Sequence, residues 1–328
     1  MKKTIDTNCM FSNETKTNFT LASLAEMMSR HVTACGVTAS ADACAHVLSS
    51  MASHRLLYVE SDGDVDGGVE LANAIASFFG CDFPPAVCTE KVTSLSDLIE
   101  GKTVTSPLGE KLASFVGCGK ICAVVIDNRS GFELSDALSE LEGYFSDENE
   151  TREIAFGKRT LVLPKNTYYI VVMPKGSAKT LLGDDMCCFA CPILCERLNT
   201  LVTDEEGKRP VSIGAEEFYG LCNEAYLGCQ PSEEVWRQID KIDAFLSARL
   251  ARGFGNDGYL TMERYFSVFA LCTGNAERAI DTFISDFIAL LAITASREDR
   301  EALVSMLSSM SSELKLTKTA LAISSLSL

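Results

Sequence analysis

The sequence predicts an α/β domain built on an open layer of parallel strands, followed by an all-helical domain. The near-continuous apolar run from Ile121 to Ile126 is typical of a central parallel strand that is covered on both faces. Apolar runs alternate with helical spacing up to about residue 200, and only helical spacing follows. We therefore expect a flexible arm at residues 1–18, a helical lead-in with an α/β core at 19–200, and a helical domain at 201–328.

The lead-in is expected to contain two helices and to end at the first strand. Thr20 is a suitable N-cap for a helix whose apolar residues recur at helical spacing, and a second helix covers about Ser40 to Ser53. The short apolar run from Leu56 to Val59 predicts a buried strand. An acidic, glycine-rich turn comes next, and an amphipathic helix then runs as far as Gly80.

The rest of the core is expected to add further strands to the same layer. The strand that begins at Ile121 ends in Asp127, and helical spacing follows from Phe132 to Phe145. Two more strands are predicted at Leu161–Leu163 and Tyr168–Met173. Beyond residue 199 the spacing predicts helices over Glu216–Leu227, Glu233–Leu250, Thr261–Cys272, Ala276–Ala292 and Glu298–Leu314.

Composition narrows the classes of function. The chain has 328 residues, 47% of them hydrophobic, and its formal net charge of −16 argues against direct binding of nucleic acid, which needs a surplus of Lys and Arg on one face. No apolar signal segment follows Met1, so we expect a cytoplasmic protein whose 14 cysteines are reduced. The apolar stretch from Phe283 to Ala295 contains Asp286 and is shorter than the roughly 20 residues of a membrane span, so no membrane partner is expected.

Several segments are informative because of the order in which they occur. The strand at Leu56–Val59 runs into the loop Asp62–Val69, and a helix with the pattern Leu-Ala-x-Ala-Ile-Ala follows. The strand ending in Asp127 comes next, then the run Leu163–Pro174 and two later segments, Tyr259–Phe266 and Asn275–Leu291. This arrangement resembles the AAA+ ATPases, and within them the methylcytosine-restriction branch. The resemblance implies a three-layer P-loop NTPase-like core with Walker A, Walker B and sensor-1 elements, followed by a helical lid.

The positions that would carry the chemistry of such a site hold other side chains. A P-loop surrounds phosphate with backbone N–H groups, reaches it with a Lys and holds Mg²⁺ with a hydroxyl. Gly68 stands at the position of the Lys and Val69 at that of the hydroxyl residue. Asn128 stands where the family keeps the Glu that activates water, and an amide cannot act as a general base. The degenerate nucleotide-site positions are therefore Asp62, Gly67, Gly68, Val69, Asp127, Asn128 and Pro174, the last in place of the sensor-1 Asn.

These departures favour a protein that binds no cofactor and acts as a scaffold, a regulator or an oligomer-forming module. Its expected partner is another protein or further copies of itself. The aspartates of the loop would also repel a triphosphate. The alternative is a divergent nucleotide hydrolase, in which Asp127 holds the metal of Mg-ATP or Mg-GTP and Lys120 or Lys175 replaces the missing Lys.

Two metal-binding interpretations stay open. Asp62, Asp64 and Asp66, followed by Gly67, match the first positions of a calcium loop, although Asn73 stands where the bidentate Glu is expected. A calcium-binding interaction protein is thus a third hypothesis. The cysteines between Cys187 and Cys195 have spacings that suit zinc or an iron–sulfur centre, but they also suit simple packing in an apolar segment.

Overall fold

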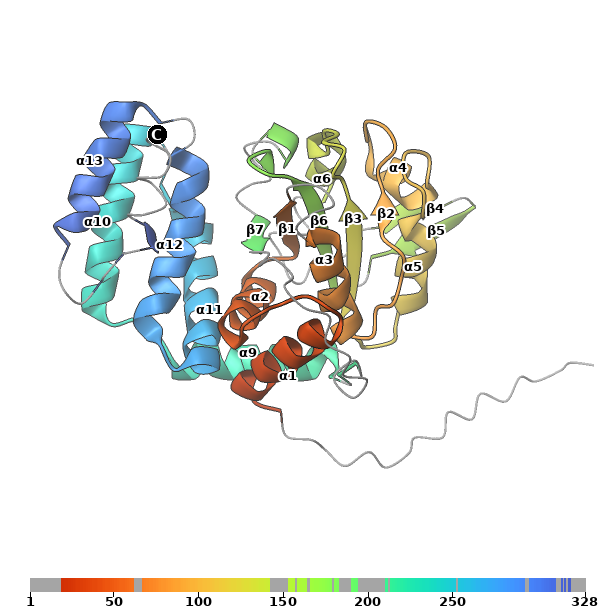
Figure 1. The fold of residues 1–328 in the computed structure, drawn as a ribbon, viewed down its shortest axis with the longest axis horizontal. Helices are drawn as coiled ribbons and strands as arrows, with labels where there is room; N and C mark the ends of the chain where they lie inside the picture. The colour runs from red at the N-terminus through yellow and green to blue at the C-terminus, as the bar shows by residue number, and fades with distance from the viewer. Residues whose placement is uncertain are drawn as a thin grey trace, which may run out of the picture.

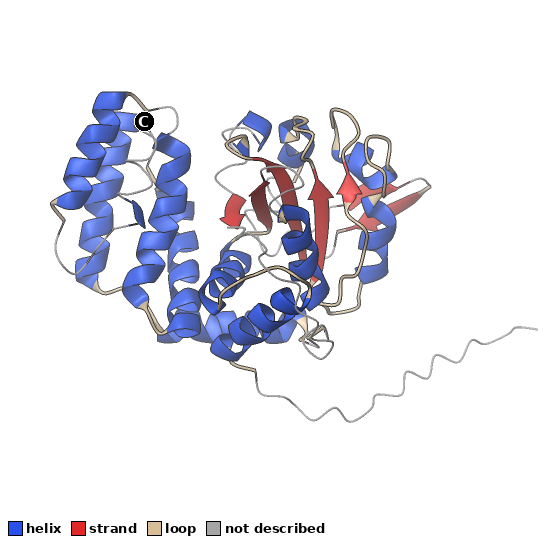
Figure 2. Cartoon of the chain, in the orientation of Figure 1, coloured by secondary structure: helices blue, strands red, loops and turns tan. Residues whose placement is uncertain are grey.

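The computed structural model describes residues 19–61, 67–141, 153–156, 158–163, 166–178, 180–182, 190–193, 210–211, 213–251, 253–292, 295–310, 314, 316 and 318–319. Within these ranges an α/β part lies on one side and a group of long helices on the other (Figures 1 and 2). The helices α1 and α2 lie at the base, between the two parts (Figure 1). The mixed α/β architecture expected from the sequence is therefore present.

The first two helices begin close to where the sequence predicts, and Thr20 is the N-cap expected for the first. Helix α1 (Leu21–Ala34) starts after Thr20, whose hydroxyl accepts a hydrogen bond of 3.1 Å from the Ser23 N–H. Helix α2 (Ala41–Ser53) starts after Ser40, which accepts from the Ala43 N–H at 3.1 Å. Such caps satisfy N–H groups that have no partner inside the helix. Both helices pack against α11 of the helical part, so they join the two parts of the chain.

The main sheet has five strands in the order β2-β3-β6-β1-β7, and every neighbouring pair is parallel. Its members are β1 (Leu56–Ser61), β2 (Ala86–Val87), β3 (Cys122–Asp127), β6 (Thr167–Pro174) and β7 (Ala190–Ile193). Every residue of β3 is buried, as expected for a strand covered on both faces. The parallel layer is confirmed. Sequence reasoning missed β2 and β7, which are short and have proline within or next to them.

One strand prediction is wrong in its placement. The segment at Leu161–Leu163 was expected in the parallel layer, but β5 (Arg159–Val162) pairs antiparallel with β4 (Glu153–Phe156) in a separate two-stranded sheet. Leu161 is 6% exposed and Val162 is 39% exposed. This alternation is that of a hairpin with one face in solvent, and a central strand would bury both residues.

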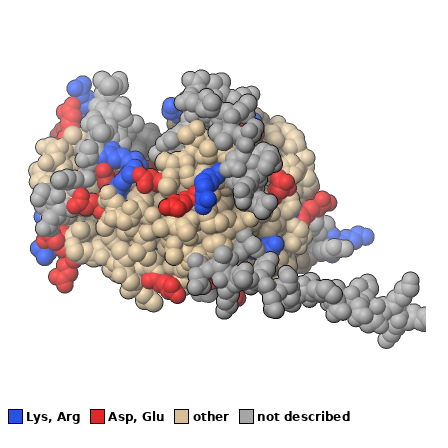
Figure 3. Space-filling model, turned by 60° about the horizontal axis from the view of Figure 1, so that its bottom comes forward, with Lys and Arg blue, Asp and Glu red and all other residues tan. Residues whose placement is uncertain are grey.

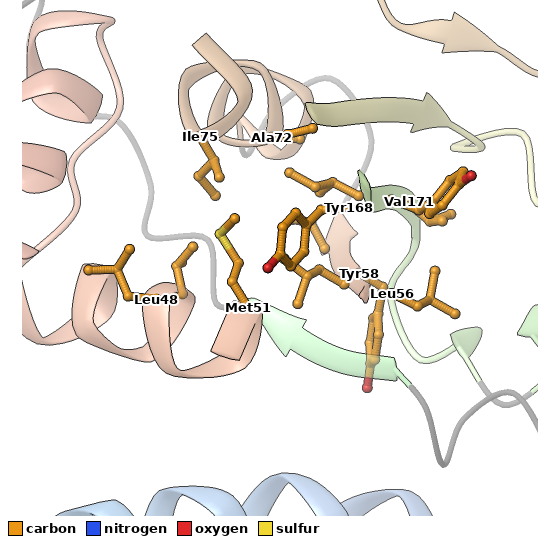
Figure 4. Close-up of a cluster of buried hydrophobic side chains, with 14 of the residues drawn as sticks. Leu48, Met51, Leu56, Tyr58, Ala72, Ile75, Tyr168 and Val171 are labelled. Atoms are coloured by element: carbon orange, nitrogen blue, oxygen red, sulfur yellow. The ribbon is translucent and has the colours of Figure 1, made fainter. Parts of the chain in front are cut away.

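Short helices cover the α/β part. These helices are α3 (Gly68–Phe78), α4 (Leu95–Glu100), α5 (Leu108–Phe115) and α6 (Ser135–Ser139). The helix expected over Phe132–Phe145 is represented by α6 alone in the described residues. Figure 4 shows side chains of α2 and α3 meeting those of β1 and β6 in one apolar cluster, which includes Leu48, Met51, Leu56, Tyr58, Ala72, Ile75, Tyr168 and Val171.

The helical part consists of α9 (Ala215–Gly228), α10 (Glu233–Leu250), α11 (Gly255–Thr273), α12 (Ala276–Ala292) and α13 (Arg297–Ser308). Helices α10 and α12 have the bounds that the sequence predicts. Helix α11 begins earlier than expected because the glycines at its start did not prevent a helix, and α13 ends at Ser308, short of Leu314. In the described part of the chain, no helix has the length and apolarity needed to cross a bilayer.

Candidate functional site

The candidate site lies at the carboxyl ends of β1, β3 and β6, which are neighbours in the sheet. Ser61 at the end of β1 is level with Pro174 at the end of β6, and Asp127 at the end of β3 is level with Val172. Ligands of open α/β sheets bind outside this edge, because the loops that follow the strands converge there. The sheet therefore brings together Asp127, Asn128 and Pro174 at the edge where β1 ends in Ser61.

Helix α3 begins at this edge without a side-chain cap. Gly67 is its N-cap, with a left-handed φ of 77° that favours glycine, and the Leu71 N–H donates to the Gly67 carbonyl at 2.8 Å. Gly68 is buried, and Val69 is partly buried against the apolar core. These two positions contribute neither a cation nor a hydroxyl to the start of the helix. The residues Asp62, Asp64 and Asp66 lie outside the described residues.

The carboxylate of Asp127 is held on both oxygens by Arg129. The Arg129 Nε donates to Oδ1 at 3.0 Å, and its Nη2 donates to Oδ2 at 2.9 Å. The backbone N–H of Arg129 also donates to Oδ1 at 3.2 Å. A two-pronged guanidinium–carboxylate pair is among the stronger side-chain interactions and fixes the orientation of both groups. The acid that would hold the metal in the alternative hypothesis is thus already bound to a cation of the chain.

Burial has the largest effect on the pKa of Asp127, which is 4% exposed. Loss of hydration raises the pKa of the Asp127 carboxyl, the Arg129 backbone N–H opposes this change, and the Glu70 carboxylate at the start of α3 adds to it. Because the charge of Glu70 is felt at Asp127, the start of α3 and the end of β3 belong to one electrostatic environment. That environment is acidic. Among the described residues, Arg129 is the cation that contacts Asp127.

Asn128 uses its side chain to shape the loop after β3. Its Nδ2 donates to the Phe132 carbonyl at 2.6 Å, and its Oδ1 accepts from the Phe132 N–H at 3.0 Å. Its own N–H donates to the Val172 carbonyl at 2.7 Å, which extends the pairing of β3 with β6 by one residue. Asn128 is fully buried. Both ends of the amide are occupied, so this residue has a structural role in the loop.

Pro174 faces the same loop from β6. A Cβ atom added to Gly131, whose φ is +73°, would lie 3.4 Å from the Pro174 Cγ, so the two residues approach closely. Lys175 follows Pro174, and its backbone N–H donates to the Ser61 carbonyl at 3.2 Å. Lys120 precedes β3 and therefore lies at the opposite, amino edge of the sheet. Of the two lysines considered as substitutes, only Lys175 is at the edge where the candidate site lies.

Sequence reasoning missed Arg129, although a signal for it was present. A basic residue two positions after a buried strand-terminal acid has the reach to neutralise it, and the lowered hydration of Asp127 makes such a partner favourable. Of the cysteine segment, only the backbone of Cys191 is described, in β7, while Cys187, Cys188 and Cys195 lie outside the described residues. Across the described ranges, no three His, Cys, Asp or Glu side chains are grouped as a metal site.

Comparison with known proteins agrees with the architecture of the chain. No protein-family model matches the sequence, and a search of curated proteins gave no match. Among solved structures, a crystal structure described as a "putative ATPase" from Cytophaga hutchinsonii is similar with a TM-score of 0.54 over 89% of this chain and 95% of that chain. Its sequence is 11% identical, so the similarity concerns the fold alone. The two chains therefore share their overall fold.

Proposed function

We propose that this chain is a catalytically degenerate AAA+-like protein, closest in its motifs to the methylcytosine-restriction branch, that works as an interaction module. In this proposal the α/β part corresponds to the three-layer P-loop core and the helices after residue 213 to the lid. The protein acts as a scaffold, a regulator or a subunit of an assembly. A fold can persist as a binding surface after its chemistry is lost, because function depends on the site and not on the fold.

The observation that carries the proposal is the pair formed by Asp127 and Arg129. In an active site of this class the strand-terminal acid helps to hold Mg²⁺ beside the phosphates. Here a guanidinium engages both oxygens of Asp127 at 3.0 and 2.9 Å, so a positive charge is already supplied by the chain. Binding a metal ion there would first require this pair to separate.

A magnesium nucleotide does not fit the residues that surround this pair. Gly68 and Val69 offer no side-chain contact to phosphate or metal, and the buried amide of Asn128 is committed to Phe132. Glu70 adds a negative charge in the first turn of α3, next to the place where phosphate would bind. Like charges in a partly desolvated site repel strongly. We therefore expect no nucleotide hydrolysis at this site.

The surface supports a protein partner or self-assembly. Basic and acidic side chains are interspersed over the face in view in Figure 3, and the net charge of the chain is −16. Nucleic acid binding would favour a concentrated basic face. Leu227, Leu260 and Leu271 of the helical part are 82%, 51% and 49% exposed, and exposed leucines are suited to contact with another protein.

The test compares the thermal unfolding midpoint of the protein alone with the midpoint in Mg-ATP, Mg-GTP or Ca²⁺. Titration calorimetry then measures the binding of each of these ligands directly. A ligand that binds the folded state must raise the midpoint. We expect no shift from either nucleotide. Gly68→Lys/Val69→Thr/Arg129→Ala serves as the matched variant, since it restores a cation and a hydroxyl and releases Asp127. Light scattering of the wild-type protein, alone and with candidate partners, then measures assembly.

A nucleotide-induced shift in the wild-type protein would replace this proposal with the divergent hydrolase. In that case Lys175 would be the substitute cation, and Lys175→Ala should remove the shift. A shift with Ca²⁺ alone would favour the calcium-binding hypothesis, and substitution of Asp62, Asp64 and Asp66 by Asn should then abolish it.

A further inference from the structure

Cysteines gather at the amino edge of the sheet, opposite the candidate nucleotide site. Cys81 follows the end of α3, and Cys122 is the first residue of β3. Both are free thiols, and they are 2% and 0% exposed. Cys118 is an exposed free thiol in the loop that leads into β3. Gly117 and Gly119, on either side of Cys118, have φ values of 74° and 66°, so this loop depends on conformations that few other residues adopt.

The Cys81 sulfur lies within a ring of hydrogen-bonding groups. It accepts a hydrogen bond of 3.2 Å from the Ala123 N–H, and as a thiol it lies 3.4 Å from the Ile121 carbonyl. Ile121 and Ala123 flank Cys122 in the chain, so the Cys81 sulfur lies beside the start of β3, where Cys122 stands. The two cysteines are 41 positions apart in the sequence, and the fold brings them close together at the amino edge of the sheet.

The surroundings make the two thiols chemically unequal. Hydrogen bonds from the Cys122 thiol and the Ala123 N–H, together with the charge of Lys120, lower the pKa of Cys81 against the effect of its burial. The same contact raises the pKa of Cys122, and burial acts in the same direction. Cys81 is thus the nucleophile of the pair, because the thiolate is the reactive form. Cys122 is the thiol that holds its proton more tightly.

We propose that Cys81 and Cys122 form a dithiol site that reacts with hydroperoxides and closes to a disulfide. In the first step the Cys81 thiolate attacks one oxygen of hydrogen peroxide, the O–O bond breaks, and protonation of the departing hydroxide yields water and a Cys81 sulfenic acid. In the second step the Cys122 sulfur attacks the Cys81 sulfur and releases a second water. Two thiols and one peroxide thus give one disulfide and two waters, with the peroxide as oxidant.

The position of the bond explains why its formation would matter. Helix α3 begins at the candidate nucleotide site, and β3 ends there with Asp127. A disulfide between Cys81 and Cys122 would join the far ends of these two elements. The Ala215 N–H donates to the Gly119 carbonyl at 2.8 Å, so the loop that carries Cys118 is also joined to the start of α9. Oxidation would therefore act on the contact between the α/β part and the helical part.

The experiment treats the full-length protein with hydrogen peroxide, blocks the remaining thiols, and maps disulfides by mass spectrometry of unreduced peptides. We expect a cross-linked peptide pair containing Cys81 and Cys122, with the loss of two hydrogen atoms, as the first product to accumulate. Treatment with a thiol reductant should reverse it. First accumulation of sulfinic acid at Cys118 or of any other disulfide would overturn the proposal, and this measurement needs no variant to fold.

Two variants sharpen the result. Cys122→Ser should leave Cys81 trapped as sulfenic acid, which a dimedone-type reagent labels. Cys272→Ser is the matched control, because Cys272 is a thiol of α11 whose pKa burial raises to about 12 and whose sulfur contacts the Leu21 carbonyl. The cross-link should form at the wild-type rate in that control. Equal labelling of Cys81 in the wild-type protein and in Cys122→Ser would exclude Cys122 as the resolving thiol.

Discussion

The imidazole Nδ1 of His46 lies 2.6 Å from the hydroxyl of Tyr265, although 219 positions separate them in the sequence. His46 belongs to α2 and Tyr265 to α11, so this hydrogen bond joins the lead-in helices to the helical part. The other ring nitrogen of His46 lies 3.8 Å from a carboxylate oxygen of Asp286 in α12, and the Lys318 ammonium is 3.5 Å from the other oxygen of that group. A buried polar network therefore fixes how α2, α11 and α12 meet.

Removing the hydroxyl from this network should weaken the fold. Tyr265→Phe removes the hydroxyl that bonds to the Nδ1 of a buried imidazole, so we expect a loss of about 1–2 kcal/mol in the free energy of unfolding. Tyr259→Phe is the control, since its hydroxyl bonds to Asp240 near the surface and should cost less. Urea unfolding measures both. Equal stability of the two variants would mean that the His46 contact contributes nothing.

Truncating Arg129 should destabilise the protein by leaving Asp127 buried without a cation. Because Arg129 is itself 28% exposed, we expect a loss of about 1–3 kcal/mol for Arg129→Ala, less than for a fully buried pair. The double variant Asp127→Ala/Arg129→Ala should recover part of this loss. Denaturant unfolding of the two single variants and the double variant gives the coupling energy, and strictly additive losses would contradict a direct pair.

Restoring the acid that the family uses should not restore hydrolysis. Asn128→Glu places a carboxylate at a fully buried position and breaks both hydrogen bonds to Phe132. We expect a loss of about 2–4 kcal/mol in stability and no nucleotide turnover in a phosphate-release assay. Asn128→Asp separates the effect of a buried charge from that of a larger side chain, because aspartate has nearly the size of asparagine and keeps an acceptor for the Phe132 N–H. Turnover in either variant would show that a working nucleotide site persists.

Acid should destabilise the protein partly through His54. Burial, assisted by the charge of His46, lowers the pKa of His54 from 6.5 to about 4. The unfolded chain therefore binds more protons between these values, so the contribution of His54 is complete above pH 6.5 and is lost as the pH falls toward 4. A shift of one unit corresponds to about 1.4 kcal/mol, and for this partly exposed side chain we expect a loss of about 1–2 kcal/mol.

The measurement compares unfolding free energies of the wild-type protein and His54→Gln at neutral and mildly acidic pH. Carboxylates contribute to acid sensitivity in both proteins, so the difference between the two slopes isolates His54. The variant should have the flatter slope. Parallel slopes would show that His54 titrates normally in the folded state.

The candidate site could be predicted only in outline from the sequence. The order of the motifs assigned Gly68, Asp127, Asn128 and Pro174 to one degenerate nucleotide site, and the structure places Asp127, Asn128 and Pro174 at one edge of a parallel sheet. The geometry around Asp127 was beyond that reasoning, because motif spacing specifies which residues are present and not which of them bond to one another. Arg129 became visible as a partner only when its guanidinium was placed against the carboxylate.

What the sequence determined by itself was local. The sequence indicated the N-cap at Thr20, the start of the second helix near Ser40, the buried strand that ends in Asp127 and the bounds of α10 and α12. These features follow from hydrogen bonds and apolar spacing within a few residues, so short windows of sequence are enough to predict them. The tertiary structure alone decided that Leu161 belongs to a separate hairpin, that His46 meets Tyr265 and that Cys81 meets Cys122. These depend on which surfaces pack together, and packing is a property of the whole chain that no local pattern encodes.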